Sequence, residues 1–281
     1  MSTHDPARFP HRVCIVTGAA SGIGQALAVE LAGRGCSLAL CDVDEPGLEH
    51  TRTLAGTDAI LLRRVDVSDR EAVHGLVRET IDHFGQADAI FNNAGVTVQQ
   101  TVADTSYEDF EWLMGINFWG VLHGTKALLP HLLERGTGAI VNISSVFGII
   151  GFPTQSAYNA SKFAVRGLTE ALRHELRGTG ITVSCVHPGG VRTNIVRSGR
   201  FHVDAGGSTS HEESTRGFEQ VARLSPAKAA QIIVEGVRRR RARILVGKDA
   251  VVIDGMQRVL PVRYGGLVSR VIDRMKRERR S

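Results

Sequence analysis

The sequence predicts an α/β fold built on a doubly wound parallel sheet, and two observations carry this prediction. From residue 12 to about residue 247, short apolar runs alternate with longer segments of helical periodicity. This alternation is expected when strands and helices follow one another in β-α-β units. Several of the apolar runs consist almost entirely of Val, Ile, Leu and Ala, which is typical of strands covered on both faces.

The predicted elements can be placed by residue number. Strands are expected at 13–17, 37–41, 59–65, 89–91, 139–143, 182–186 and 243–246. Helices are expected at 22–34, 69–84, 107–135, 155–177 and 226–239. Because crossovers between parallel strands are right-handed, these helices should cover both faces of the sheet.

Two regions interrupt this rhythm. The segment 188–225 is long and rich in Gly, Ser, Thr and His, and long irregular segments in compact domains are often lids or binding loops. The second region, 248–281, follows the last predicted strand. The sequence therefore predicts a catalytic domain over 1–247, with a lid at about 188–225, and a C-terminal extension over 248–281.

Composition restricts the class of protein. Of the 281 residues, 42% are hydrophobic and 22% are charged, as in ordinary globular domains. No run of about 18 apolar residues and no signal-like start is visible, so a cytoplasmic location is expected. The four cysteines have neither CxxC nor CxxH spacing, so no metal site is expected.

The net charge of +5 is unevenly distributed. Residues 258–281 carry eight Lys/Arg and two Asp/Glu, so the remainder of the chain is close to neutral. A basic surface over the whole domain is thus not indicated, and no nucleic-acid partner is expected.

A glycine-rich turn joins the first predicted strand to the first helix. It reads Thr17-Gly18-Ala19-Ala20-Ser21-Gly22-Ile23-Gly24. Glycine lets the backbone turn sharply and approach a pyrophosphate, and a helix N-terminus offers free amides to the phosphates. We therefore expect Gly18, Ser21, Gly22, Ile23 and Gly24 to contact a dinucleotide.

An acidic residue, Asp42, ends the second predicted strand 18 residues after Gly24. At this distance a carboxylate can accept hydrogen bonds from the adenosine ribose and repel a 2′-phosphate. No Lys or Arg stands at 19–21 or 41–44 to neutralise such a phosphate. These features predict NAD, with NADP less favoured. The alternative role of helix cap suits Asp44 better.

Polar residues also follow the third and fourth predicted strands, as Asp66-Val67 and Asn92-Asn93-Ala94-Gly95. Ligands of open α/β sheets bind at the carboxyl ends of the strands. Each motif by itself is compatible with ordinary turn chemistry. Together with the glycine-rich turn, they predict one edge of a cofactor cleft that includes Asp66, Val67, Asn93, Ala94 and Gly95.

A candidate catalytic group follows the fifth predicted strand. Ser144-Ser145 ends that strand, Tyr158 comes 13 residues after Ser145, and Lys162 lies one helical turn further. A nearby ammonium should favour the phenolate and lower the tyrosine pKa, which suits proton exchange with an alcohol. An isolated YxxxK pair is usually a surface feature, whereas its combination with a strand-end serine and the glycine-rich turn points to catalysis.

These motifs resemble those of the short-chain dehydrogenase/reductase family, in family order and over roughly residues 11–247. The matching motifs are Thr17-Gly18 with Gly22-Ile23-Gly24, Asp66-Val67, Asn92-Asn93-Ala94-Gly95, Asn117, Ser144-Ser145, Tyr158 with Lys162, and His187-Pro188-Gly189. The resemblance implies a single Rossmann-type domain with a seven-stranded parallel sheet.

The resemblance also implies residue roles. Tyr158 would be the acid/base, Lys162 would bind the nicotinamide ribose and tune Tyr158, and Ser145 would orient the substrate. Asn117 matches the residue that positions a proton-relay water. Further cofactor contacts are implied for Pro188, Gly189, Val191 and Thr193.

The resulting prediction is an NAD-dependent oxidoreductase that interconverts a secondary alcohol and a ketone. The apolar stretch 146–152, together with Phe201, indicates a small-molecule alcohol or ketone that is hydrophobic and bulky; the alternative is that these residues pack the domain. The alternative is a non-catalytic NAD-binding sensor or scaffold on the same fold. Since the family commonly pairs its long helices, here 107–135 and 155–177, a homodimer or homotetramer is expected.

The C-terminal extension contains a basic amphipathic pattern. Leu267, Val268, Val271, Ile272 and Met275 share one helical face, while Arg270, Arg274 and Arg277 lie largely elsewhere. This pattern favours docking on the protein itself or on a partner, with peripheral contact to an anionic membrane as the alternative.

Overall fold

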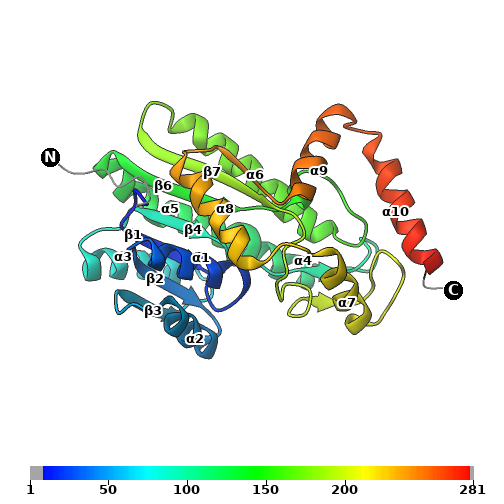
Figure 1. Cartoon of the computed structure of the whole chain (residues 1–281), viewed down its shortest axis with the longest axis horizontal. Coiled ribbons are helices and arrows are strands. Elements are labelled where there is room, and N and C mark those ends of the chain that lie inside the picture. The colour runs from blue at the N-terminus through cyan, green and yellow to red at the C-terminus, as the bar shows by residue number, and fades with distance from the viewer. Residues whose placement is uncertain (1–8, 279–281) are drawn as a thin grey trace.

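The computed structural model describes residues 9–278, without the side chains of residue 271 and residues 274–278 (Figure 1). Its centre is a seven-stranded parallel sheet in the order β3-β2-β1-β4-β6-β7-β9. The strands are β1 (Val13–Thr17), β2 (Ser37–Asp42), β3 (Ile60–Arg64), β4 (Ala89–Asn92), β6 (Thr137–Ile143), β7 (Gly180–Pro188) and β9 (Arg243–Val246). All seven predicted strands are therefore confirmed.

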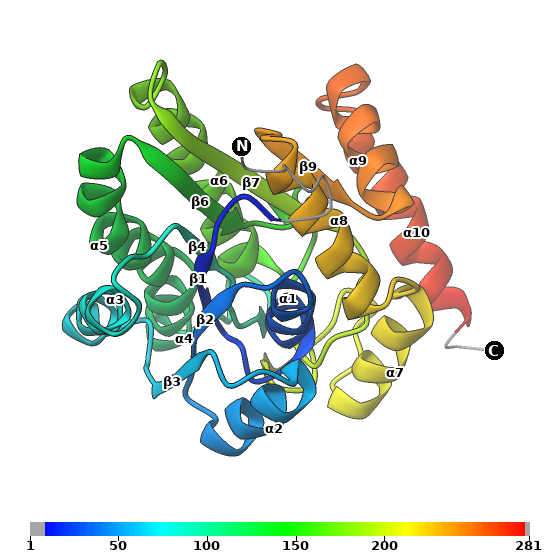
Figure 2. The same cartoon turned by 60° about the vertical axis from the view of Figure 1, so that its left-hand side comes forward.

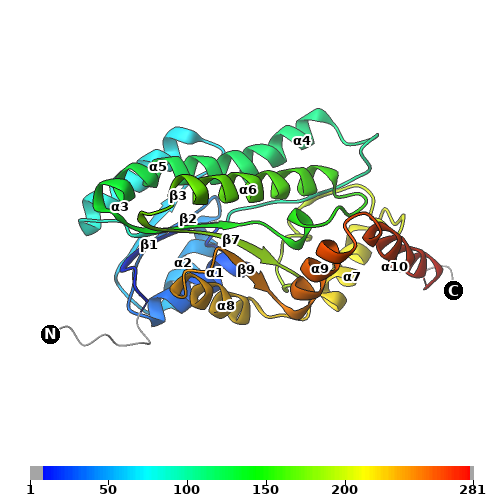
Figure 3. The same cartoon turned by 90° about the horizontal axis from the view of Figure 1, so that it is seen from above.

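Helices cover both faces of this sheet (Figure 3). One layer contains α1 (Gly22–Gly33), α2 (Glu45–Ala55) and α8 (Pro226–Arg238), and the other contains α3 (Arg70–Phe84), α5 (Gly120–Arg135) and α6 (Ser156–Glu175). Within β1, Cys14 and Val16 pack against the first layer, whereas Ile15 packs against the second. Burial on both sides explains why the strand sequences are apolar throughout.

The helix predicted over 107–135 is interrupted. A π-helical turn (Gly115–Trp119) separates α4 (Tyr107–Met114) from α5. Its central residue, Asn117, is fully buried and bonds to the backbone of Val96. Turns of π-helix inside α-helices frequently occur at functional positions, and this one contains the predicted site residue Asn117.

The segment 188–225 is less irregular than predicted. It contains the short strand β8 (Arg200–Phe201), which pairs with β5 (Val98–Gln99), and the helix α7 (His211–Val221). Ser210 caps α7, with Glu213 at the third helical position. Ser-x-x-Glu is the capping-box signature that would have located this helix. Helix α2 was also not predicted, although Asp44 caps it as expected.

The C-terminal extension forms α9 (Lys248–Val259) and α10 (Tyr264–Glu278), which lie beside α7 at one end of the molecule (Figures 1 and 2). On the predicted apolar face, Ile272 is buried, Val268 is half-buried and Leu267 is 38% exposed. The side chains of Val271, Arg274, Met275 and Arg277 lie outside the described residues. Within 9–278, no helix has the length and apolar character needed to cross a bilayer.

Candidate active site

The glycine-rich turn meets the end of β4 where the strand order reverses. The Nδ2 of Asn93 donates to the carbonyls of Thr17, at 2.9 Å, and Gly18, at 3.1 Å. In return, Thr17 Oγ1 accepts from the amides of Asn93 and Ala94, both at 3.0 Å. These reciprocal bonds fix two predicted motifs to each other at the switch point, where open α/β sheets bind ligands.

Close packing explains two of the glycines in this turn. Gly18 has a φ of +65°, and a Cβ there would lie 2.7 Å from the Cα of Ala94. A Cβ on Gly24 would lie 2.0 Å from the carbonyl oxygen of Gly18. Neither position can hold a larger residue without moving the backbone, so the turn brings α1 close to the strand end.

The beginning of α1 fits a phosphate group. Ser21 makes no side-chain cap bond at the start of α1, as is also true of the N-cap residues of α6 and of α9 (Lys248–Val259). The first amides of a helix need an acceptor. At the start of α1 no side chain of the described residues accepts from these amides, and the glycines of the turn allow a ligand to approach the backbone closely. Both features suit the pyrophosphate of a dinucleotide.

Asp42 lies directly beside the glycine-rich turn. Its Oδ2 accepts from the amide of Ala20 at 3.0 Å, and its Oδ1 accepts from the amide of Val43 at 2.7 Å. The strand register places Arg64 of β3 opposite Asp42, and Arg64 is exposed. This cation is near Asp42 in space but distant in sequence, so inspection of the residues around Asp42 could not find it.

Asp66 and Val67 stand at the same edge of the sheet. Asp66 is exposed, and its Oδ1 accepts from the amide and hydroxyl of Ser68 at 2.9 and 2.7 Å. Val67 is buried against Gly120, where a Cβ would lie 2.7 Å from Val67 Cγ2. The carboxylate of Asp66 thus shapes a local turn, while Val67 joins that turn to α5.

Helix α6 presents Tyr158 and Lys162 on one buried face. Their exposed fractions are 9% and 3%. The Nζ of Lys162 lies 5.6 Å from the centre of the Tyr158 ring and donates to the carbonyl of Ile143 at 3.0 Å. Ser145 lies close enough to Tyr158 for its hydroxyl to favour the phenolate. The structure therefore brings the predicted serine, tyrosine and lysine into one cluster.

The ionisation of this cluster differs from the expectation. Burial raises the pKa of Tyr158 to about 12, and the hydrogen bond with Ser145 opposes only part of this rise. Burial also lowers the pKa of Lys162 to about 8. The expected lowering of the tyrosine pKa is therefore wrong for the protein by itself, because transferring the phenolate out of water outweighs the stabilisation it receives.

Asn117 connects the tyrosine helix to the end of β4. Its Oδ1 accepts from the amide of Val96 at 2.8 Å, and its Nδ2 donates to Ser161 Oγ at 3.1 Å. A Cβ on Gly95 would lie 3.2 Å from Asn117 Oδ1 and 3.3 Å from Lys162 Nζ. Gly95 is thus the point at which the predicted cofactor edge touches the predicted catalytic residues.

The loop after β7 closes the other side of the site. Thr193 lies against the glycine-rich turn, since a Cβ on Gly22 would be 3.3 Å from its Cβ. Val191 is buried and forms a β-bridge with Leu224. Pro188 and Gly189 lead from the strand into this loop. All predicted cofactor residues therefore stand at the carboxyl edge of the sheet.

Sequence reasoning missed the role of Asn159, which lies between Tyr158 and Lys162. Its Nδ2 donates to the carbonyls of Phe147, at 2.7 Å, and Ile150, at 2.8 Å, and its Oδ1 accepts from the amide of Phe152 at 3.1 Å. Asn159 therefore fixes the loop after Ser145. Its position between the tyrosine and the lysine was the available signal.

His187 is a second residue whose role was not predicted. Its Nδ1 lies 3.0 Å from the carbonyl of Ser145, while its buried Nε2 has no hydrogen-bond partner. Burial lowers the pKa of His187 to about 4. A neutral ring that donates from Nδ1 satisfies the Ser145 carbonyl and holds the backbone of the serine.

Aromatic rings surround the candidate acid/base. Phe147 stacks on Phe152, with ring centres 5.1 Å apart, and meets Tyr158 edge-on at 6.2 Å. Phe201, which was also predicted near the substrate, instead stacks on His211 of α7 at 5.0 Å. The apolar surroundings of Tyr158 thus come from the loop after Ser145, whereas Phe201 packs within the 188–225 segment.

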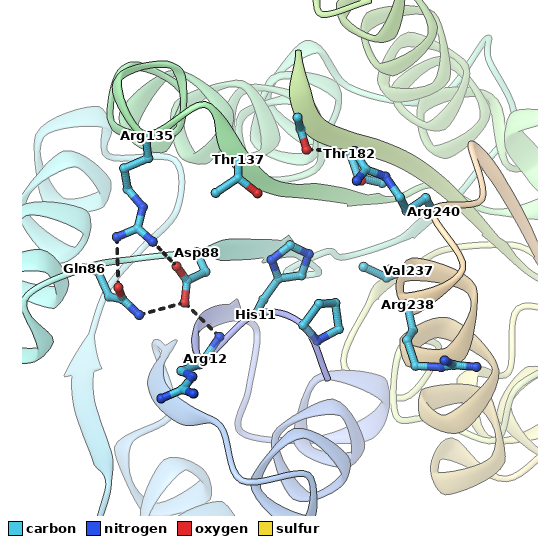
Figure 4. Close-up of a pocket in the computed structure, with 12 residues that line it drawn as sticks. His11, Arg12, Gln86, Asp88, Arg135, Thr137, Thr182, Val237, Arg238 and Arg240 are labelled. Atoms are coloured by element: carbon cyan, nitrogen blue, oxygen red, sulfur yellow. Dashed lines mark hydrogen bonds and ion pairs between the residues drawn. The ribbon is translucent and has the colours of Figure 1, made fainter. Parts of the chain in front are cut away.

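A separate cavity of about 380 Å³ lies at the opposite, amino edge of the sheet (Figure 4). It is lined by Asp88, Arg135 and Arg240 among others, and contains none of the predicted site residues. Arg135 pairs with Asp88 at 2.8 Å, and Arg240 donates to the carbonyl of Gly180 at 2.8 Å. The size of this cavity therefore does not identify it as the active site, because Arg135 and Arg240 already have protein partners.

The fold and the cluster around Tyr158 define a Rossmann-type oxidoreductase, and comparison with known proteins gives the family. The description "short chain dehydrogenase" matches residues 12–202. The chain belongs to this family of oxidoreductases, whose members act on alcohol and carbonyl groups.

Three similar proteins illustrate this relationship. A Mycobacterium tuberculosis protein named SadH is 43% identical over 265 residues, covering 93% of this chain and 95% of its own. Levodione reductase from Leifsonia aquatica is 35% identical, covering 79% and 82%. The crystal structure of a short-chain dehydrogenase from Burkholderia phymatum in complex with NAD has a TM-score of 0.80 and 32% identity, covering 89% of this chain and 94% of that one.

Proposed function

We propose that this protein is an NAD-dependent oxidoreductase that interconverts a secondary alcohol and a ketone, with a bulky hydrophobic substrate. The observation that carries the proposal is the buried cluster of Ser145, Tyr158 and Lys162 beside Gly95. A sensor or scaffold would need the cofactor cleft but not this cluster.

In the proposed reaction, the Ser145 hydroxyl holds the substrate oxygen. The Tyr158 phenolate accepts the hydroxyl proton when the alcohol is oxidised, and the phenol returns a proton to the oxygen when the ketone is reduced. When bound, NAD supplies the acceptor for the hydride. Lys162 holds its positive charge near the phenol, which favours the phenolate once the proton leaves. Asn117 fixes the backbone around Val96 and the hydroxyl of Ser161, and so keeps α6 in register with β4.

Asp42 supports NAD over NADP. Its carboxylate lies beside the turn and would repel an adenosine 2′-phosphate. Arg64 acts in the opposite direction, since it stands across from Asp42 in the strand register. We propose that Asp42 decides the preference because it is bonded to the turn itself through Ala20.

The stacked rings of Phe147 and Phe152 support a hydrophobic substrate. Phe147 lies beside Tyr158, where the reacting carbon of an alcohol must sit, and Phe152 stacks on Phe147. Aromatic faces add apolar contact and favour flat or cyclic groups. The name of levodione reductase agrees with a carbonyl compound as the substrate of that relative.

The test is Tyr158→Phe, assayed with NAD and with NADP against 1-phenylethanol, 2-octanol and cyclohexanol. The variant should lose at least about 10³-fold in kcat, because it lacks the exchangeable proton. Its affinity for NAD, measured by calorimetry, should stay within about twofold. Wild-type turnover by the variant would refute the role of Tyr158, and NAD binding without turnover by the wild type on all three alcohols would favour a sensor.

A further inference from the structure

A carboxylate of the C-terminal extension reaches the loop that leads from β7 into the cofactor site. Asp249, in the first turn of α9, accepts at Oδ2 from the amide of Gly190 at 2.6 Å. A Cβ on Gly189 would lie 2.1 Å from Asp249 Oδ2, and a Cβ on Gly247 would lie 2.3 Å from Oδ1. The carboxylate therefore occupies a space that Gly189 and Gly247 leave open.

The opposite side of the same loop is held by the end of the 188–225 segment. Leu224 donates its amide to the carbonyl of Gly190 at 3.2 Å and accepts from the amide of Arg192 at 2.9 Å. The loop is thus fixed between Leu224 on one side and Asp249 on the other. The Leu224 contact belongs to the backbone, so the Asp249 contact is the one that a side-chain substitution can remove.

A second contact joins the extension to the substrate side. The Tyr264 hydroxyl, at the start of α10, accepts from the amide of Gly151 at 3.0 Å. Gly151 belongs to the loop after Ser145 that contains Phe147 and Phe152, and Asn159 holds this loop from the other side. Helices α9 and α10 lie together at this end of the molecule (Figure 3).

We propose that the C-terminal extension positions both halves of the active site, Asp249 through the cofactor loop and Tyr264 through the substrate loop. This inference rests on the proposed function. Both are positioning residues, because each acts through backbone rather than on the reacting atoms. The proposal makes the two contacts separable: loss of Asp249 should affect NAD, and loss of Tyr264 should affect the alcohol.

Helix α9 has an independent anchor, which provides a matched control. Asp254, five residues beyond Asp249, is buried and pairs with Arg243 of β9 and with Arg258. Asp254→Asn removes the same charge from the same helix but makes no change at Gly190. It should lower the unfolding temperature while leaving NAD affinity within about twofold of the wild type.

The first arm compares Asp249→Ala with Asp249→Asn. The loss of this hydrogen bond to a charged group should raise the Kd and KM for NAD about tenfold in the alanine variant. Asparagine keeps an acceptor oxygen and should recover part of this loss. Calorimetry with NAD gives the Kd without turnover, and the KM for the alcohol should not change.

The second arm uses Tyr264→Phe, which removes one hydroxyl. The KM for the fastest of 1-phenylethanol, 2-octanol and cyclohexanol should rise about fivefold, as expected for the loss of one neutral hydrogen bond. The Kd for NAD should not change.

Wild-type measurements separate the two ways of failing. If the wild type neither binds NAD nor oxidises any of the three alcohols, the proposed function fails and the positioning roles fail with it. If the wild type is active, the positioning proposal alone is overturned by either of two results. One is unchanged constants in both variants; the other is a parallel change in NAD and alcohol constants that Asp254→Asn reproduces.

Discussion

Buried charged and polar groups have different partners at the two edges of the parallel sheet. At the amino edge, Asp88 accepts from the amides of Arg12 and Val13, at 2.8 and 2.9 Å, and pairs with Arg135. At the carboxyl edge, Lys162 donates to a main-chain carbonyl, and no ion pair joins it to a carboxylate of the described residues. His187 also keeps a buried nitrogen without a partner.

This difference separates groups that stabilise the fold from groups that are available for chemistry. A buried charge that meets its counter-charge and further hydrogen bonds offsets its cost of desolvation, whereas a buried ammonium without a counter-charge does not. The carboxyl edge thus lowers stability in order to keep Lys162 and Tyr158 close together. Proteins commonly depart from optimal packing and pairing at functional sites.

The largest expected effect comes from Lys162→Met. Removal of the ammonium should reduce kcat by about 10³-fold, because the phenolate of Tyr158 loses its nearest positive charge. The same variant should be about 2 kcal/mol more stable at pH 7, since the buried charge costs about 3 kcal/mol and the bond to Ile143 returns about 1. Chemical denaturation together with steady-state kinetics measures both quantities.

The sign of the pH dependence follows from the lowered pKa of Lys162. Between about pH 8 and its ordinary value of 10.5, the unfolded chain binds a proton that the folded protein has lost. The contribution of Lys162 to the free energy of unfolding of the wild type therefore rises with pH across that window. The advantage of Lys162→Met should be greatest at or below pH 8 and shrink as the pH approaches 10, and a constant difference would contradict this assignment.

An intermediate effect is expected at the amino edge from Asp88→Ala. The variant leaves Arg135 and two backbone amides without their acceptor, which should cost about 3 kcal/mol of unfolding free energy. At a temperature where the variant remains folded, kcat should stay within about twofold of the wild type. A large loss of turnover without a loss of stability would show that the two edges are not functionally distinct.

The smallest effect is expected on the surface, where Arg63 pairs with Glu79. Both side chains are exposed, by 45% and 40%. Exposed ion pairs contribute less than about 1 kcal/mol, so Glu79→Ala should shift the denaturation midpoint only slightly and leave activity unchanged. This variant gives the baseline against which the Asp88→Ala result is judged.

Much of the fold could be predicted because its signals are local. The strands were visible as apolar runs, and the glycine-rich turn indicated the first strand-to-helix junction. Helix α7 carried a local signal as well, in Ser210 and Glu213, that was not used. The π-turn at Asn117 was not predicted, and the hydrogen-bond partner of the Asn117 side chain, the backbone of Val96, lies 21 residues away.

The candidate site divides in the same way. Ser145, Tyr158 and Lys162 could be identified from spacing, because a helical turn brings Tyr158 and Lys162 onto one face. The positions of Arg64 opposite Asp42 and of Asp249 beside Gly190 could not, since strand register and helix docking create them. The direction in which the pKa of Tyr158 shifts also depended on the burial of its side chain, which cannot be inferred from residue spacing.

The sequence by itself determined the layered α/β architecture, the order of the motifs and the identity of the residues at the carboxyl edge. Hydrophobic periodicity and glycine spacing encode these features within a few residues of one another. Only the tertiary structure decided how deeply each group is buried and which segments distant in sequence contact the site. Desolvation and contact depend on the whole packed molecule, and so the extension's place beside the cofactor loop became visible only in the folded chain.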